Sequence, residues 1–287
     1  MAARGAASGK MSGPRRASIV MVIAGTCFAA VALASHLLAD PAPQADLSGT
    51  PSTNATATIP PGPQGELIAY GRDLVTDTPK YAGSYVTARL SCAACHPGAG
   101  TQPHAGSFLG IYALFPQWNK RANRFIALQD RVAECFLYSM NGHPPAYYSR
   151  EMVAITEYIA WLSRGAPTGV GFPDQEPIAV NPLKPPDVTR GQAVYAARCI
   201  SCHGVDGNGE SMTFPPLWGP QSFNDKAGMS RMDRIAPFVK AAMPQNAPGT
   251  LSDQEAADVA AYVLSQPRPH FDKDRQIEFP GANAGYF

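Results

Sequence analysis

Apolar residues recur three and four positions apart along much of this chain, which is the period of an α-helix with one buried face. In residues 151–164, for example, Met152, Ile155, Ile159 and Trp161 form such an apolar stripe. The pattern predicts helices at residues 66–75, 125–140, 151–164, 188–197, 232–243 and 252–266. The segments between them are rich in glycine and proline, so we expect an all-α protein whose helices are joined by loops.

The predicted helices form two sets with the same order of elements, which indicates an internal repeat. Each set has a first helix, a Cys-x-x-Cys-His motif, a loop rich in glycine and proline, a helix that carries a sulfur-containing residue, and a terminal helix. The first motif ends at His96, and Cys135 follows 39 residues later. The second motif ends at His203, and Met243 follows 40 residues later. A small cytochrome c has this order of elements, so the sequence predicts two tandem cytochrome c-like domains joined by a Pro/Gly-rich linker.

The Cys-x-x-Cys-His motif is the attachment signature of a c-type haem, in which two thiols form thioether bonds with the porphyrin and the histidine ligates the iron. Zinc is the alternative, but a zinc site would need further cysteine or histidine ligands at close spacing, and the sequence has none. We therefore predict two covalently bound haems c, with His96 and His203 as axial ligands. The thioether cysteines are Cys92 and Cys95 in the first motif and Cys199 and Cys202 in the second.

Met243 is the candidate for the other axial position of the second haem, because it precedes Pro244 in the segment before the terminal helix. A thioether is a neutral ligand that favours ferrous iron and raises the reduction potential. The alternatives are Met212, Met229 and Met232, although most methionines fill apolar cores.

The first haem has no methionine at the equivalent position. Its candidates for the other axial ligand are Cys135, Met140, His104 and His143. Cys135 has no partner cysteine, since four of the six cysteines belong to the haem motifs and Cys27 lies in an N-terminal apolar run. A thiolate ligand lowers the potential of the iron, so it makes sense where the sulfur itself takes part in chemistry.

Several cations precede Cys135 in the sequence. Arg131, Cys135 and Ser139 stand four residues apart, which places them along one side of the predicted helix, and Arg121 lies ten residues before Arg131. Such cations would bind a small oxyanion beside the sulfur. Alternatively, they hold haem propionates or face solvent. The nearby aromatic residues are predicted to pack in the haem core: Trp118, Phe125, Phe136 and Tyr138.

The N-terminal forty residues differ from the rest of the 287-residue chain. Four cations precede an uncharged apolar run at about residues 17–38, and no acidic residue occurs before Asp40. This pattern predicts either a cleaved signal peptide or an uncleaved membrane anchor. The formal net charge of the chain is +1, so neither a nucleic acid nor an anionic membrane surface is implied as a partner.

Proline-rich composition marks the borders of the predicted domains. The predicted division is a signal peptide or anchor at 1–40, a flexible tether at 41–63, the first cytochrome c domain at 64–165, a linker at 166–187, the second cytochrome c domain at 188–270 and a tail at 271–287.

Over roughly residues 64–270 the sequence resembles the dihaem thiosulfate dehydrogenases. The resemblance rests on residues 91–101 (SCAACHPGAGT), 115–117 (FPQ), 130–142 (DRVAECFLYSMNG), 215–225 (PPLWGPQSFND) and 238–244 (FVKAAMP). The segment around Cys135 is its most specific part.

The resemblance implies a periplasmic enzyme that joins two thiosulfate molecules into tetrathionate with release of two electrons, or runs the reverse reaction. It implies that the first haem is the active site, with His96 and Cys135 as its ligand pair. By the same resemblance, Arg121, Arg131 and Ser139 contact the substrate.

The second haem is implied to relay electrons outward, with His203 and Met243 as its ligands. The acceptor would be a soluble periplasmic protein such as a small cytochrome c or a high-potential iron-sulfur protein. Some members of the family ligate with a lysine beside this methionine; here that position is Ala242, which argues against a ligand change.

Two other functions stay open on the sequence. A dihaem electron carrier without sulfur chemistry would have two haems with ordinary methionine or histidine ligands. A haem subunit of a sulfur-oxidising complex, which attaches thiosulfate to a carrier protein, would need a partner for activity.

Overall fold

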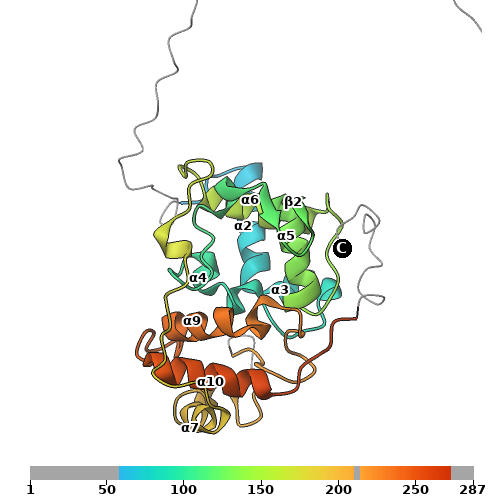
Figure 1. Cartoon of the computed structure of the whole chain (residues 1–287). Helices are drawn as coiled ribbons and strands as arrows, with labels where there is room; N and C mark the ends of the chain where they lie inside the picture. Colours follow the sequence, from blue (N-terminus) through green and yellow to red (C-terminus); the bar gives the residue numbers. More distant parts are fainter. Residues whose placement is uncertain (1–57, 210–213, 273–287) are drawn as a thin grey trace, which may run out of the picture. The chain divides into compact units, whose positions relative to one another are not determined.

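The computed structural model describes residues 58–209 and 214–272 (Figure 1). The predicted signal peptide or anchor, most of the predicted tether, Met212 and most of the predicted tail lie outside the described residues. Within the described part of the chain, no helix is both long and apolar enough to cross a membrane.

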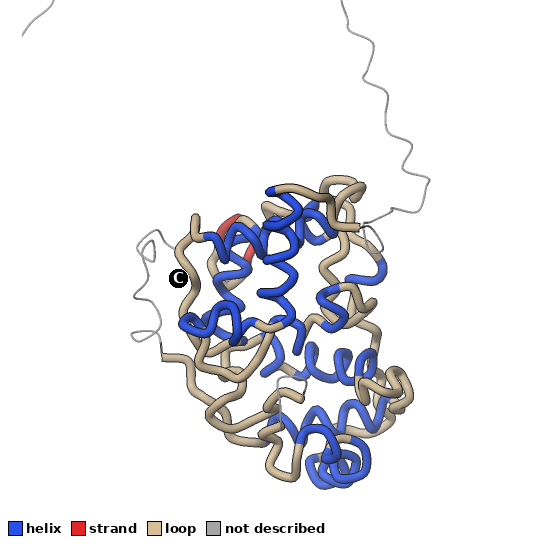
Figure 2. Tube along the Cα trace, turned by 180° about the vertical axis from the view of Figure 1, so that it is seen from behind, coloured by secondary structure: helices blue, strands red, loops and turns tan. Residues whose placement is uncertain are grey.

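Helices make up the regular structure of the described residues, apart from one short hairpin (Figure 2). The α-helices are α2 (Pro63–Thr76), α3 (Thr78–Ala82), α4 (Pro97–Gly100), α5 (Leu128–Glu134), α6 (Arg150–Leu162), α7 (Val188–Arg198), α8 (Ile200–His203), α9 (Met232–Ala242) and α10 (Asp253–Ser265). The shorter helical turns are η2 (Gly83–Tyr85), η3 (Cys92–Ala94), η4 (Ile111–Leu114), η5 (Cys135–Ser139), η6 (Pro173–Gln175) and η7 (Gly228–Ser230). The antiparallel hairpin pairs β1 (Gln117–Asn119) with β2 (Arg124–Ile126).

The internal repeat is visible in how the first and terminal helices cross in each half. In the first half α2 packs against α6, and in the second half α7 packs against α10. A glycine lies at each crossing: a Cβ on Gly71 would meet the carbonyl oxygen of Ala154, and a Cβ on Gly191 would meet that of Asp258. The two crossings therefore match residue for residue, and each needs a residue without a side chain.

Capping residues fix where the terminal helices begin. The Ser149 hydroxyl accepts a hydrogen bond from the Met152 N–H at 3.2 Å, which satisfies a backbone donor in the first turn of α6. Ser252 and Glu255 form a capping box at the start of α10. The helix starts expected near residues 151 and 252 are thereby confirmed.

Each half has its own apolar core. The large, fully buried members in the first half include Ile68, Leu74, Phe136, Met152, Ile155 and Leu162. The core of the second half is formed by Tyr195, Trp218, Ile235, Ala236, Val259, Ala260 and Val263.

A third apolar cluster joins the two halves. It packs Leu90, Leu137, Tyr138 and Met140 of the first half against Phe223 and Ala227 of the second. Hydrogen bonds cross the same boundary: the Arg89 N–H donates to the Gln221 carbonyl at 2.8 Å, and the buried Asn224 side chain donates to the Leu137 carbonyl at 2.9 Å. The loop that begins at residue 221 is therefore held against the helical segment that follows α5.

The predicted helix over residues 125–140 is wrong in its first part and altered in its second. Phe125 lies in strand β2, and the helix begins only at Leu128. At Cys135 the α-helix passes into a π-helical turn, in which the Met140 N–H donates to the Cys135 carbonyl at 2.9 Å. Such turns are rare and occur frequently at functional sites.

Two of the predicted haem-packing aromatic residues lie at the surface instead. Trp118 is 52% exposed and Phe125 is 65% exposed, and their rings meet edge to face across the hairpin at 5.5 Å between centroids. The cross-strand pair explains their positions, because opposite residues of a hairpin pack on the same face. Phe136 and Tyr138 are buried, as expected.

Part of the segment predicted as a linker packs on the first half. The Phe172 side chain is 8% exposed, and the Gln175 side chain donates to the Leu109 carbonyl at 2.5 Å. A Cβ on Gly110, which has a positive φ of 75°, would overlap the Phe172 ring.

Candidate functional site

The first motif histidine is held by a backbone carbonyl. His96 Nδ1 lies 2.5 Å from the Gly106 oxygen, which can only accept, so Nδ1 carries the proton and Nε2 keeps its lone pair for a metal. Gly106 has a φ of 68°, and a Cβ there would lie 2.8 Å from His96 Nδ1. Burial lowers the pKa of His96 to about 4, which keeps the ring neutral.

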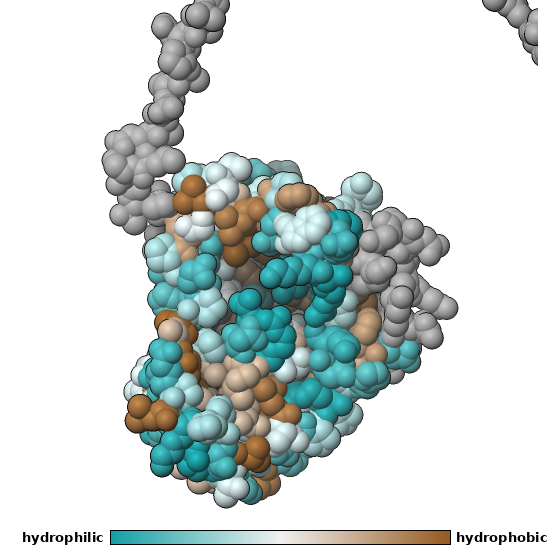
Figure 3. All heavy atoms as spheres, viewed as in Figure 1, coloured by the Kyte–Doolittle hydropathy of each residue, from teal (hydrophilic) through white to brown (hydrophobic). Residues whose placement is uncertain are grey.

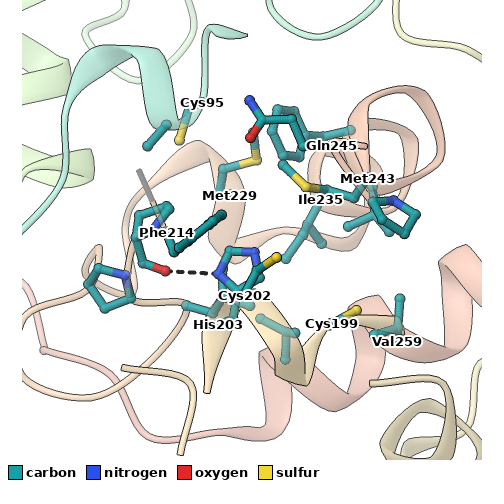
Figure 4. Close-up of a pocket in the computed structure, with 18 of the residues that line it drawn as sticks. Cys95, Cys199, Cys202, His203, Phe214, Met229, Ile235, Met243, Gln245 and Val259 are labelled. Atoms are coloured by element: carbon teal, nitrogen blue, oxygen red, sulfur yellow. Dashed lines mark hydrogen bonds between the residues drawn. The ribbon is translucent and has the colours of Figure 1, made fainter. Parts of the chain in front are cut away.

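The second motif histidine is held in the same way. His203 Nδ1 lies 3.0 Å from the Pro215 carbonyl oxygen, drawn as the dashed line in Figure 4, and burial lowers the pKa of this ring too. In both halves the motif thus provides two thiols and a neutral imidazole with a free Nε2. This donor set fits a covalently attached haem.

Around His96 lies a cavity of about 500 Å³, called here the Cys135 cavity. Its polar and sulfur-containing wall residues include Cys95, His96, Asn119, Lys120, Arg121, Arg131, Glu134, Cys135, Tyr138 and Ser139 from the first half and Lys226, Met229, Arg231 and Arg234 from the second. Hydrophilic side chains also gather across the middle of the face shown in Figure 3, between the region of β2 and α5 and that of α9.

Arg131 lies between a sulfur and a carboxylate. Its Nη1 donates to Glu134 Oε2 at 3.2 Å, and the Glu134 Oε1 accepts from the Asn119 amide at 2.9 Å. The electrostatic interaction with Cys135, and to a smaller extent that with Glu134, raises the pKa of the Arg131 guanidinium, against the effect of burial. The guanidinium is therefore a permanent cation beside Cys135, and a single carboxylate holds it in place.

Arg121 is fixed on three sides. Its guanidinium lies over the Tyr138 ring at 4.0 Å from the centroid, its Nη2 donates to the Lys226 carbonyl at 2.9 Å, and its backbone N–H donates to the Asn119 side chain at 2.8 Å. Stacking and hydrogen bonding hold the cation at the rim of the cavity without neutralising it.

The structure brings the sequence-predicted site residues together. Arg121, Arg131, Cys135 and Ser139 all line the cavity that contains His96. The other candidates for the axial position lie elsewhere. Met140 is 3% exposed in the apolar cluster between the halves, and His104 Nδ1 is hydrogen-bonded to the Glu176 carbonyl at 2.9 Å. The His143 ring lies beside that of Tyr85, tilted by 55° with 5.6 Å between centroids.

Sequence reasoning missed the contribution of the second half to this cavity. Lys226, Arg231 and Arg234 line it from the loop before α9 and from the start of that helix. Lys226 directly follows the motif at residues 215–225, and this proximity was the one signal in the sequence that could have pointed to it.

The cavity around His203, called here the Met243 cavity, is mainly apolar. Among its wall residues in the described part of the chain, Arg198 is the one arginine, and lysine, aspartate and glutamate are absent. Both Met229 and Met243 line it, and their side chains lie across the pocket from the His203 ring (Figure 4). Met232, the remaining described alternative, does not line it.

The two cavities share part of a wall. Cys95 and Met229 line both of them, and Ala93 and Ala94 of the first motif also line the Met243 cavity. The two haem-binding motifs therefore lie close to each other, as electron transfer between them requires.

Comparison with known proteins relates both halves to cytochromes. A family model described as SoxA/TsdA, cytochrome c domain, matches residues 80–168. A model described as cytochrome C oxidase, cbb3-type, subunit III, matches residues 186–263.

Over most of its length the chain is similar to proteins named thiosulfate dehydrogenase. It is 39% identical over 272 residues to one from Allochromatium vinosum, covering 92% of this chain and 98% of that protein. It is 41% identical over 216 residues to one from Stutzerimonas stutzeri, covering 74% of this chain and 70% of that protein. Among solved structures, thiosulfate dehydrogenase (TsdBA) from Marichromatium purpuratum superposes with a TM-score of 0.69 at 34% identity. That match covers 81% of this chain and 51% of the other, so the present chain spans about half of that longer protein.

Proposed function

Because this chain belongs to the thiosulfate dehydrogenase family, a family of c-type cytochromes, we propose that it oxidises thiosulfate, joining two thiosulfate dianions into tetrathionate at the Cys135 cavity. The balanced reaction converts two thiosulfate dianions into one tetrathionate dianion and two electrons. One sulfur-sulfur bond forms, no proton is exchanged, and the reverse reaction reduces tetrathionate.

The chain has two cytochrome c domains and holds two covalently bound haems c. Thioether bonds would form at the two cysteines of each motif, and His96 and His203 would be axial ligands. We propose Cys135 and Met243 for the opposite positions. When bound, the haems supply the one-electron redox chemistry that takes up the electrons from thiosulfate.

The observation that carries this proposal is the presence of a cysteine sulfur and several cations in one cavity. Arg121 and Arg131 would hold the substrate by charge-assisted hydrogen bonds, and the Ser139 hydroxyl would donate to a sulfonate oxygen. Positioning two like-charged reactants is the difficult part of the reaction, and fixed cations reduce their repulsion. A simple electron carrier needs no such cavity.

We also propose that the reaction takes place in the periplasm, because c-type cytochromes are exported proteins. The physiological acceptor would be a small cytochrome c or a high-potential iron-sulfur protein. The apolar surroundings of the second motif suit a haem that passes electrons on without binding a substrate.

Stoichiometry tests the proposal. Purified holoprotein should reduce two equivalents of ferricyanide for each two thiosulfate consumed and each tetrathionate formed, with no second protein added. Absence of turnover in either direction would indicate an electron carrier. Turnover that requires a carrier protein would indicate a haem subunit of a sulfur-oxidising complex.

A further inference from the structure

A loop of the second cytochrome domain, residues 221–231, forms one side of the Cys135 cavity. The fully buried Asn224 holds this loop in place: its side chain donates to the Leu137 carbonyl at 2.9 Å, and its backbone N–H donates to the Tyr138 carbonyl at 3.1 Å. Both carbonyls belong to the π-helical turn that begins at Cys135. The loop is therefore fixed directly to the segment that carries the reactive sulfur.

This loop and the helix after it bring three cations to the cavity. They are Lys226, Arg231 and Arg234, and all three side chains are exposed enough to meet a ligand from solvent. Arg231 Nε donates to Asp233 at 3.0 Å, and Arg234 Nε lies 3.7 Å from the same carboxylate. Asp233 thus holds both guanidinium groups. Lys226 forms no ion pair within 4 Å among the described residues: the adjacent Asp225 feels its charge but pairs with His270 instead.

Both sides of the cavity carry a surplus of positive charge. The first half contributes three cations, Lys120, Arg121 and Arg131, and one carboxylate, Glu134. The second half contributes three cations to the described cavity wall; the carboxylates that interact with them, Asp233 and Asp225, do not line it. Each side can therefore attract a dianion.

We propose that Lys226, Arg231 and Arg234 form a second subsite for a thiosulfate dianion, so that each cytochrome domain holds one of the two substrates. This inference rests on the proposed function, in which a sulfur atom of one dianion forms a bond with a sulfur atom of the other. The first subsite, at Arg121 and Arg131, lies beside Cys135. The second faces it from the loop that Asn224 fixes, and tetrathionate would span both.

A different role for these cations would be to hold haem propionates. The two roles predict different results, because a cation that neutralises a propionate changes the potential and absorption spectrum of the haem. A cation that binds substrate changes affinity and leaves the haem as it was.

The test uses the oxidised holoprotein and tetrathionate, because oxidised haems hold no electrons with which to reduce tetrathionate to thiosulfate. Calorimetric titration gives its dissociation constant for the wild type, Lys226→Met, Arg234→Gln and the double variant. Lys226→Arg keeps the charge. Lys184→Met removes an exposed lysine that lies outside the cavity and serves as the matched control. Redox titration and the absorption spectrum are recorded for each protein.

We expect the double variant to weaken tetrathionate binding at least about tenfold and to raise the half-saturating thiosulfate concentration by a similar factor. Lys226→Arg should remain within about threefold of the wild type, and Lys184→Met should match it. Haem potentials should be unchanged. If the double variant does not retain both haems, the single variants carry the test, with smaller effects in the same direction.

Two results would overturn the inference alone: a double variant that binds tetrathionate like an active wild type, or a shift in haem potential with unchanged affinity. A wild type that neither binds tetrathionate nor oxidises thiosulfate would overturn the proposed function and this inference with it.

Discussion

The two haem cavities share a scaffold and differ in their surroundings. In both, a carbonyl oxygen holds the motif histidine, and a glycine allows the first and terminal helices to cross. Yet the Cys135 cavity is lined by six cations, whereas the Met243 cavity is mainly apolar. The shared parts hold a haem. The parts that differ are hairpin β1–β2 and the π-helical turn in the first half and the loop at residues 221–231 in the second, and these line the cavity in which we propose that the substrate binds.

The strongest test of this difference is removal of the sulfur that distinguishes the Cys135 cavity. Cys135→Ala should lower thiosulfate-dependent ferricyanide reduction by at least about 1,000-fold, because the proposed reactive group is lost. Met140→Leu is the matched control, since this buried sulfur ends the same helical turn but does not line the cavity. Full activity in Cys135→Ala would show that the two cavities do not differ in the way proposed.

The cations provide the next test. Arg131→Gln should lower kcat/KM for thiosulfate about 10- to 100-fold, since one charge-assisted contact to a dianion is lost. Arg72→Gln removes an exposed arginine of α2 that pairs with the adjacent Asp73, and it should leave kcat/KM unchanged. An equal loss in both variants would point to general electrostatic attraction and not to a site.

The sequence predicts those features of the two halves that depend on residues close together in the chain. Motif spacing predicted both haem sites, and helical periodicity predicted α6, α7, α9 and α10 to within about two residues. The helical spacing of Arg131, Cys135 and Ser139 correctly placed them in one cavity, although a π-helical turn intervenes.

Features set by tertiary contacts were missed. The run at residues 125–140 has helical periodicity, but Phe125 pairs with Trp118 across a hairpin that no local pattern signals. Lys226 lies more than 90 residues after Cys135, and tertiary contacts such as the Asn224 hydrogen bonds bring its loop back to the first half. A sequence pattern with a period of a few residues carries no information on such a contact.

The helix crossings test the part that the halves share. Gly71→Ala should lower the free energy of unfolding by about 1–3 kcal/mol, because the new methyl group meets a backbone carbonyl that cannot move without separating the helices. Gly191→Ala should have a similar effect in the second half. Gly83→Ala is the control. Gly83 has a φ of −60° and a Cβ there would meet no atom within 4 Å, so the free energy of unfolding of this variant should change by less than about 0.5 kcal/mol. Urea titration measures all three, and unequal effects at Gly71 and Gly191 would weaken the equivalence of the halves.

The smallest expected effect concerns a position at which the two halves have different residues. Ala154 in the first half corresponds to Asp258 in the second, since each offers its carbonyl to the glycine at the crossing. Burial alone would raise the pKa of Asp258. Hydrogen bonds from the Arg190 side chain and the Asp187 N–H together have the larger, opposite effect, so the net shift of this pKa is downward. The folded state thus binds a proton less readily than the unfolded state, so this carboxylate stabilises the fold above a pH of about 4 and loses that contribution as the pH falls through its folded pKa. The difference in stability between wild type and Asp258→Asn should therefore be full at neutral pH and shrink below about pH 4. Urea titrations at several pH values measure it, and a difference that does not vary with pH would mean that Asp258 acts by shape and not by charge.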